Sequence, residues 1–220
     1  MEEHRFRTAR SARYFTLGDP GPQVSDLWIA CHGYGQLARD FLTGFETIAA
    51  AARLIVAPEA LSRFYTGTPD ARQPGARVGA SWMTREDRLA EIDDQVEYLD
   101  GLAGDLLGRI SAQPRIRVLG FSQGVSTVCR WIAFGKTRPA EVVLWAGEIP
   151  ADLPDSLLQE RLGGIAVHLV SGTRDRLVPD ALAAHQEARL RKAGVEPRTH
   201  RFDGGHRLDR GILAALGTGR

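Results

Sequence analysis

The sequence has few cysteines, no long apolar run and no excess of one charge. Only two of its 220 residues are cysteines, Cys31 and Cys129, without the spacing of a disulfide scaffold or a zinc site. Its 28 lysines and arginines nearly balance 27 aspartates and glutamates, which gives a net charge of +1. Such a balance argues against binding to nucleic acid or to an anionic membrane surface. No apolar run reaches transmembrane length, so we expect no stable membrane association.

The beginning of the chain also lacks the pattern of a secretory leader. Its first five residues are mostly polar, and no apolar core of a signal peptide accompanies them. We therefore expect a cytoplasmic protein whose two thiols are buried and reduced. A length of 220 residues, without internal repeats or an evident linker, predicts one domain that spans residues 1–220.

Apolar segments alternate with helical patterns along most of the chain. Strands are expected at residues 26–32, 53–57, 115–120, 140–146, 165–171 and 198–202, with one or two edge strands within 5–17. Helices are expected at 37–52, 85–110, 123–135, 179–193 and from about 207, and 61–84 is expected to be irregular. Apolar strands separated by helices indicate an α/β fold, with a parallel sheet covered on both faces. Ligands of such sheets bind beyond the carboxyl ends of the strands.

A G-x-S-x-G pattern follows one of these strands. Residues 116–119 end in Gly-Phe-Ser-Gln-Gly at 120–124, and a helical pattern begins at once. Strand, sharp turn and helix are the context in which this pattern presents a reactive serine at a helix N-terminus. Ser122 is therefore the candidate nucleophile. Taken alone, the segment also fits a serine that simply caps a helix.

Two further loops after strands supply the other groups needed for nucleophilic catalysis. Asp175 follows the strand at 165–171, and His206 follows the strand at 198–202. The order Ser, Asp, His is the one used by hydrolases built on this kind of sheet. His206 would take the proton of Ser122, and Asp175 would fix the tautomer of His206 and stabilise the imidazolium.

Other acids and histidines fit these roles less well. Asp175 itself could simply cap a turn, and Asp180 nearby is a rival that lies in the first turn of an expected helix. Asp203 is too close to His206 in the chain to be its usual partner. Of the six histidines, only His206 combines a position after a strand with flexible neighbouring glycines.

Stabilisation of an oxyanion requires hydrogen-bond donors, and a second glycine-containing loop can supply one. The loop after the first apolar strand reads His32-Gly33-Tyr34-Gly35, in which the glycines allow a backbone N–H to turn inward. We expect the backbone N–H groups of Tyr34 and Gln123 to form the oxyanion hole. His32 is expected to hold this loop by hydrogen bonds and not to act as a base.

Four segments together resemble the α/β-hydrolase superfamily and, within it, the phospholipase/carboxylesterase group that includes acyl-protein thioesterases. The segments are His-Gly-Tyr-Gly, Gly-Phe-Ser-Gln-Gly, Gly-Thr-Arg-Asp with Val-Pro, and Gly-His, and the similarity covers roughly residues 25–215. The resemblance implies a small, nearly lidless serine esterase that uses no metal or cofactor. It assigns the nucleophile, acid, base and oxyanion donors to Ser122, Asp175, His206, Tyr34 and Gln123.

The substrate side departs from this group. Tyr34 stands where thioesterases tend to have leucine, and Glu148 follows a strand where small residues are more usual, so protein depalmitoylation is not carried over. Apolar side chains in the expected loops could form an acyl pocket or pack the loops onto the body. These candidate pocket residues are Phe64, Tyr65, Trp82, Met83 and Leu177. Trp82 and Met83 could instead form a contact in a homodimer.

The sequence thus predicts a serine carboxylesterase that hydrolyses short- to medium-chain carboxylic esters through an acyl-Ser122 intermediate. A thioesterase or lysophospholipase would use the same site, and the motifs do not separate these activities. A hydrolase-fold protein that binds a small ligand with little turnover is a third interpretation, because a fold does not fix a function.

Overall fold

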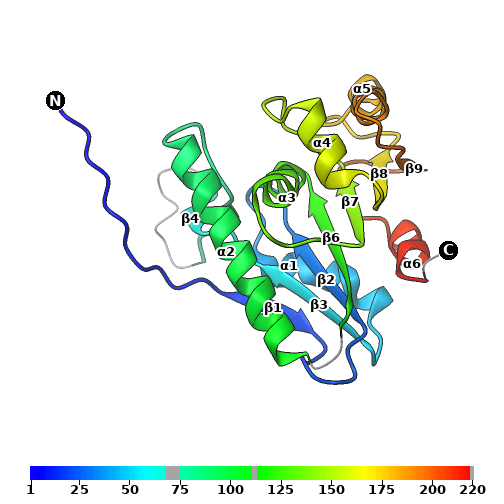
Figure 1. Ribbon diagram of the computed structural model, residues 1–220, viewed down its shortest axis with the longest axis horizontal. Coiled ribbons are helices and arrows are strands. Elements are labelled where there is room, and N and C mark those ends of the chain that lie inside the picture. The colour runs from blue at the N-terminus through cyan, green and yellow to red at the C-terminus, as the bar shows by residue number, and fades with distance from the viewer. Residues whose placement is uncertain (68–74, 111–112, 219–220) are drawn as a thin grey trace.

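A computed structural model describes residues 1–67, 75–110 and 113–218 of the chain. Its central sheet has the order β1-β3-β2-β6-β7-β8-β9 (Figure 1). Neighbouring strands are parallel throughout, except that β1 runs antiparallel to β3 at the edge. The strands are β1 Tyr14–Leu17, β2 Asp26–Cys31, β3 Arg53–Pro58, β6 Arg115–Phe121, β7 Glu141–Trp145, β8 Ala166–Gly172 and β9 Arg198–Phe202. The predicted mostly parallel α/β sheet is confirmed.

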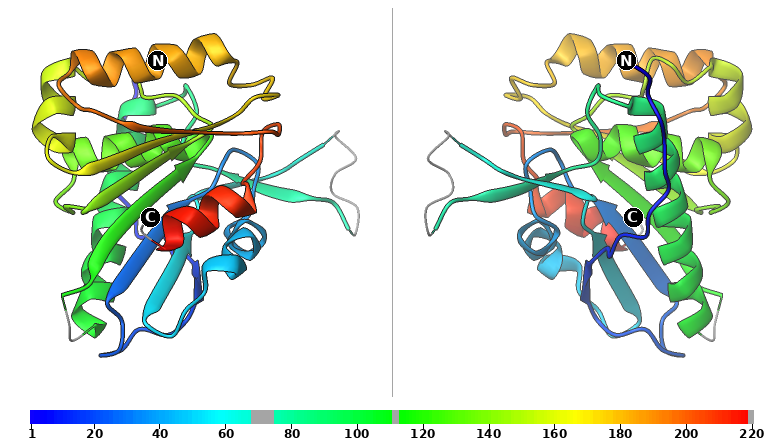
Figure 2. Two further views of the ribbon diagram at one scale, coloured as in Figure 1. Left: turned by 90° about the vertical axis from the view of Figure 1, so that its right-hand side faces the viewer. Right: turned by 90° about the vertical axis from the view of Figure 1, so that its left-hand side faces the viewer.

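Helices cover both faces of this sheet (Figures 1 and 2). One face is covered by α2 Arg88–Arg109, α3 Gln123–Phe134, α4 Asp155–Leu162 and α5 Asp180–Lys192. The other face is covered by α1 Ala38–Leu42, the 3-10 helix η1 Thr43–Ile48 and α6 Arg210–Thr218. Each face has its own cluster of buried apolar side chains. Because successive residues of a strand face opposite clusters, the strands appear in the sequence as unbroken apolar runs.

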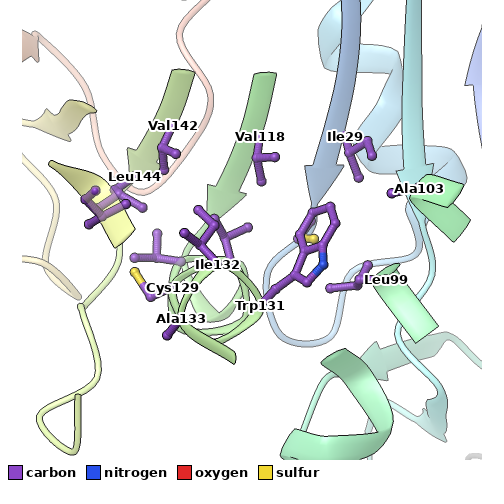
Figure 3. Packing of buried hydrophobic residues seen from close by; sticks show 14 of the residues in the cluster. Ile29, Leu99, Ala103, Val118, Cys129, Trp131, Ile132, Ala133, Val142 and Leu144 are labelled. Atoms are coloured by element: carbon purple, nitrogen blue, oxygen red, sulfur yellow. The ribbon is translucent and has the colours of Figure 1, made fainter. Parts of the chain in front are cut away.

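The alternation of side chains along β2 shows how both clusters form from one strand. Ile29 joins the cluster beneath α2 and α3, whereas Trp28 faces the cluster beneath α1 and α6. Figure 3 shows Trp131 of α3 between Ile29 and Leu99 of α2. Cys31 and Cys129 are both buried and unpaired, and burial raises the pKa of the Cys129 thiol to about 12. Neither thiol is therefore in a reactive, deprotonated state near neutral pH.

The structure differs from the sequence expectation in three places. Residues 61–67 and 75–84, expected to be irregular, contain a hairpin of β4 Ser62–Tyr65 and β5 Val78–Ser81 that projects from the body (Figure 2). Its strands pair only with each other, and their sequences, Ser-Arg-Phe-Tyr and Val-Gly-Ala-Ser, contain no apolar run that would have revealed them. The short helix α4 was not expected, and the helix expected at 37–52 is divided into α1 and η1. Residues 68–74 lie outside the described part of the chain.

Among the described residues, no helix is both long enough and apolar enough to cross a membrane. The carboxyl ends of β6, β7, β8 and β9 meet at one edge of the sheet, because these strands are adjacent and parallel. The loops that carry the candidate catalytic residues leave the sheet at this edge.

Candidate active site

Ser122 occupies a sharp turn between β6 and α3. Its φ of 54° and ψ of −117° are unusual for a residue with a side chain, and its N–H donates to the carbonyl of Trp145 at 2.9 Å. A Cβ at Gly120 would lie 2.3 Å from the Gly124 carbonyl oxygen, and a Cβ at Gly124 would lie 2.2 Å from that of Cys31. Both glycines are therefore needed for α3 to lie this close to β6 and β2. The close packing holds Ser122 in its strained conformation.

Asp175 and His206 form a close pair in the next loops along the sheet edge. His206 Nδ1 lies 2.7 Å from Asp175 Oδ2, and the Asp175 side chain is fully buried. The other carboxylate oxygen accepts hydrogen bonds from the N–H groups of Leu177 and Val178 at 2.8 and 3.0 Å. An ionised carboxylate can only accept, so Nδ1 carries the proton and Nε2 is left as the basic nitrogen.

Ser122 and His206 line the same open cleft, which has a volume of about 210 Å³. The cleft lies where β6, β7 and β8 end. Its remaining walls come from the start of α3, the loop after β7, and the loop and helix that follow β8. These lining residues are Gln123, Ser126, Ala146, Gly147, Glu148, Leu177, Val178 and Leu182. The His206 ring also packs on Phe121, with ring centroids 5.0 Å apart. The cleft therefore brings the candidate nucleophile Ser122 and the candidate base His206, with Asp175 behind it, to one surface.

The rival acids have other partners. Asp180 pairs with Arg201, and Asp203 lies 3.1 Å from Arg174. Neither residue lines the cleft, whereas Asp175 lies directly behind His206. The geometry therefore supports Asp175 as the acid.

His32 is fully buried, and both of its ring nitrogens are occupied. Nε2 accepts a hydrogen bond from the N–H of Ala60 at 3.1 Å, so Nδ1 is the protonated nitrogen that donates to the Gly33 carbonyl at 2.8 Å. Burial lowers the pKa of His32, which keeps the ring neutral. His32 thus fastens the Gly33 loop to the chain after β3.

The loop that begins at Gly33 lies directly beside Ser122. A Cβ built on Gly33 would lie 3.1 Å from the Cβ of Ser122, closer than side chains normally approach. The amides on either side of Tyr34 donate to Gln36 Oε1 at 2.8 Å and to the Ala80 carbonyl at 2.9 Å. Within the described residues, the N–H of Tyr34 has no acceptor.

The N–H of Gln123 likewise has no acceptor in the described part of the chain. Gln123 is the first residue of α3, and the first N–H groups of a helix have no acceptor within the helix. Two amides without an acceptor therefore lie near Ser122. That of Gln123 is next to it in the chain, and that of Tyr34 follows Gly33, which lies against the Ser122 side chain. This is the arrangement that an oxyanion hole requires.

Only one of the five candidate pocket residues lines the cleft. Leu177 does so, and its side chain is 68% exposed. Trp82 lies instead in the core at 3% exposure, where its indole N–H donates to the His32 carbonyl at 2.8 Å. Met83 is half-buried outside the cleft, with its sulfur 3.1 Å from an Arg130 guanidinium nitrogen.

The other two candidates lie on the hairpin. Phe64 of β4 is half-buried and packs on Tyr34, with ring centroids 5.1 Å apart. Tyr65 is 57% exposed, and none of these three aromatic side chains lines the cleft. They form an aromatic surface on the hairpin side of the Tyr34 loop.

Sequence reasoning did not assign the Gln123 side chain a role. Its Oε1 accepts the N–H of Trp82 at 3.1 Å, and its Nε2 donates to the Met83 carbonyl at 2.9 Å. The side chain therefore fastens the end of the hairpin to the start of α3. Ser126, Glu148 and Leu182 also line the cleft; of these, only Glu148 had a signal, as a carboxylate directly after a strand.

Among the described residues, no group of three or more His, Cys, Asp or Glu side chains is placed to hold a metal ion. The groups gathered at the cleft are those of acyl transfer: a hydroxyl, an imidazole backed by a carboxylate, and two free backbone amides.

No protein-family model and no curated protein matches the sequence. Solved structures do match. Esterase PE8 is 23% identical with a TM-score of 0.72, over 95% of this chain and 97% of that one. Acyl-protein thioesterase 2 of Zea mays is 16% identical with a TM-score of 0.68, over 94% and 97%. The carboxylesterase of Bacillus cereus is 15% identical with a TM-score of 0.67, over 94% and 92%. The chain therefore has the α/β-hydrolase fold that it shares with these proteins.

Proposed function

We propose that residues 1–220 form one domain that is a serine carboxylesterase, with Ser122, His206 and Asp175 as its triad. The observation that carries this proposal is the 2.7 Å Asp175–His206 pair in the cleft that Ser122 also lines. The structural neighbours, which are named as two esterases and a thioesterase, support the same class of reaction.

Acylation begins at the Ser122 hydroxyl. His206 Nε2 removes the proton while Oγ attacks the ester carbonyl carbon, and Asp175 stabilises the imidazolium that forms. The carbonyl oxygen gains negative charge, which the N–H groups of Tyr34 and Gln123 stabilise. The tetrahedral intermediate then expels the alkoxide, which takes the proton from His206 and leaves as the alcohol.

Deacylation repeats these steps with water in place of Ser122. His206 Nε2 takes a proton from the water as its oxygen attacks the acyl-Ser122 carbonyl. When the intermediate collapses, the Ser122 oxygen receives that proton and the carboxylic acid is released. Every proton in this cycle is held by Ser122, His206, water or substrate, so the cycle uses no cofactor.

The apolar part of the open cleft is small, which favours short- to medium-chain acyl groups. Leu177, Val178 and Leu182 supply its apolar surface. An acyl chain of a few carbons would cover these side chains without extending far beyond them.

The test is hydrolysis of p-nitrophenyl esters from acetate to palmitate by the wild type and by Ser122→Ala. We expect a rate maximum at short or medium chains and a loss of at least about 10³-fold in Ser122→Ala. Ser156→Ala, at an exposed serine of α4 outside the cleft, is the matched control. A fluorophosphonate probe followed by intact-mass measurement should modify the wild type and Ser156→Ala, but not Ser122→Ala.

Full activity in a folded Ser122→Ala protein would overturn the proposed mechanism. A rate maximum on palmitate, or on acyl thioesters offered in parallel, would favour the lysophospholipase or thioesterase alternative. Absence of Ser122-dependent turnover and of labelling would favour a protein that only binds its ligand.

A further inference from the structure

Glu148 places an unpaired negative charge in the catalytic cleft. Its side chain is exposed and lines the same cleft as Ser122 and His206. Among the described residues it forms no ion pair, although the structure contains many such pairs elsewhere. Apart from His206, it is the only ionisable side chain among the described residues that line the cleft. The described lining of the cleft therefore carries one carboxylate and no lysine or arginine.

The backbone on both sides of Glu148 is held in place. The Glu148 carbonyl accepts a hydrogen bond from Ser126 Oγ at 2.8 Å, which joins it to α3. The next N–H, that of Ile149, donates to the buried Gln186 side chain of α5 at 2.9 Å. Arg189 then donates to the Ile149 carbonyl at 2.9 Å. The loop is thus fixed between two helices, while the carboxylate of Glu148 is left free.

The arginines that contact Asp152 or the backbone just after Glu148 already have partners. Arg130 lies 3.0 Å from Asp152, and Arg88 pairs with the same carboxylate. Arg189 is engaged by backbone carbonyls and by Asp155 at 3.7 Å. These cations therefore have partners of their own, and a cation on a ligand would meet an uncompensated carboxylate at Glu148.

We propose that Glu148 is a specificity residue that favours esters carrying a quaternary or protonated amine near the reacting carbonyl and disfavours anionic esters. The apolar side chains of the cleft, Leu177 and Leu182, would contact the uncharged arm of the same ester. This inference rests on the proposed esterase function and names the substrate class of the same site. Glu148 acts on binding and orientation and takes no part in bond making.

Isosteric ester pairs test this selectivity. Butyrylcholine is compared with the butyrate ester in which carbon replaces the quaternary nitrogen, and the same replacement is made in a trimethylammonium-bearing acyl chain. The wild type should prefer the cationic member of at least one pair by about tenfold in kcat/KM at low salt. Glu148→Gln should bring that ratio close to one, and added salt should reduce it in the wild type. Glu160→Gln, at an exposed carboxylate of α4, should leave the ratio unchanged.

Equal rates within both pairs in the wild type, or a preference that persists in Glu148→Gln, would overturn the inference while leaving the esterase function intact. Binding provides a readout that needs no turnover. Choline titrated into Ser122→Ala by calorimetry should bind about tenfold more tightly than its carbon isostere, and the added Glu148→Gln substitution should abolish the difference. Equal binding of the two would also contradict the proposal, whether or not any ester is hydrolysed.

Discussion

Polar groups gather at both the amino and the carboxyl ends of the strands of the central sheet, but they are paired to different extents at the two ends. At the amino ends of the strands, Arg53 and Arg117 lie 2.6 and 3.0 Å from Asp26, and Arg115 lies 2.7 Å from Glu141. Arg117 also lies 3.4 Å from Glu141, so the ion pairs are linked in one network. At the carboxyl ends, Asp175 and His206 form a single pair, and the hydroxyl, carboxylate and amides around them are left free.

The amino-end network also holds α6 in place. Arg117 donates to the Leu216 carbonyl at 2.8 Å and Arg53 to the Gly217 carbonyl at 2.5 Å, which satisfies carbonyls at the end of that helix. Both guanidinium groups lie over the Trp28 ring. The comparison shows how one fold separates stability from reactivity. Groups joined in ion pairs hold a helix to the sheet, and groups left unpaired remain available to a substrate.

The largest effect should come from removing the acid of the carboxyl-end pair. Asp175→Asn can no longer fix the His206 tautomer or stabilise the imidazolium, so kcat/KM should fall by about 10³–10⁴-fold. Hydrolysis of p-nitrophenyl butyrate measures this loss, and a cooperative thermal transition shows that the variant is folded. Asp203→Asn, at the exposed rival acid, should retain nearly full activity. A comparable loss in Asp203→Asn would transfer the acid role away from Asp175.

Breaking the amino-end network should instead lower stability. Arg117→Met leaves Asp26 and Glu141 short of a buried partner and frees the end of α6, which should cost about 3–5 kcal/mol in the free energy of unfolding. Urea unfolding measures this loss. The remaining folded enzyme should keep its kcat/KM, because Arg117 lies at the other end of the sheet. Arg210→Met, at an exposed arginine, is the control and should unfold like the wild type. A normal urea midpoint in Arg117→Met would show that the network contributes little.

These two ends were not equally predictable from the sequence. The proposed carboxyl-end residues follow strands in a fixed order, so apolar runs and the loops after them were enough to suggest Ser122, Asp175 and His206. The amino-end network joins residues such as Asp26 and Arg117 that are far apart in the chain, and no local pattern links them. Its partners become apparent only when the strand order is known.

The pocket residues show the same limit. The sequence does not show whether an apolar side chain in a loop faces the cleft, as Leu177 does, or the core, as Trp82 does. Trp82 packs in the core with its indole N–H on the His32 carbonyl, a position set by the hairpin that the sequence did not reveal. Glu148 was visible as an unusual carboxylate, but its lack of a partner depends on where the surrounding arginines pair.

The smallest effect concerns pH and the histidines at the amino end. His168 of β8 is buried, with Nδ1 2.8 Å from His200 Nε2 and Nε2 3.5 Å from Glu141. Burial, with His200 and the nearby positive charges of Arg198, Arg117 and Arg115, lowers the pKa of His168 to about 4. Burial lowers the pKa of His200 as well.

A lowered histidine pKa means that the unfolded chain binds protons more readily than the folded chain between about pH 6.5 and pH 4. The free energy of unfolding should therefore fall by roughly 2 kcal/mol as pH drops through this window, and urea midpoints at about pH 7.5 and pH 4.5 measure the change. His168→Gln removes one titrating group and should reduce this dependence, whereas His185→Gln, at an exposed histidine of α5, should not. If both variants follow the wild-type pH curve, acid sensitivity arises elsewhere, and the amino-end network stays paired independently of the His168 proton.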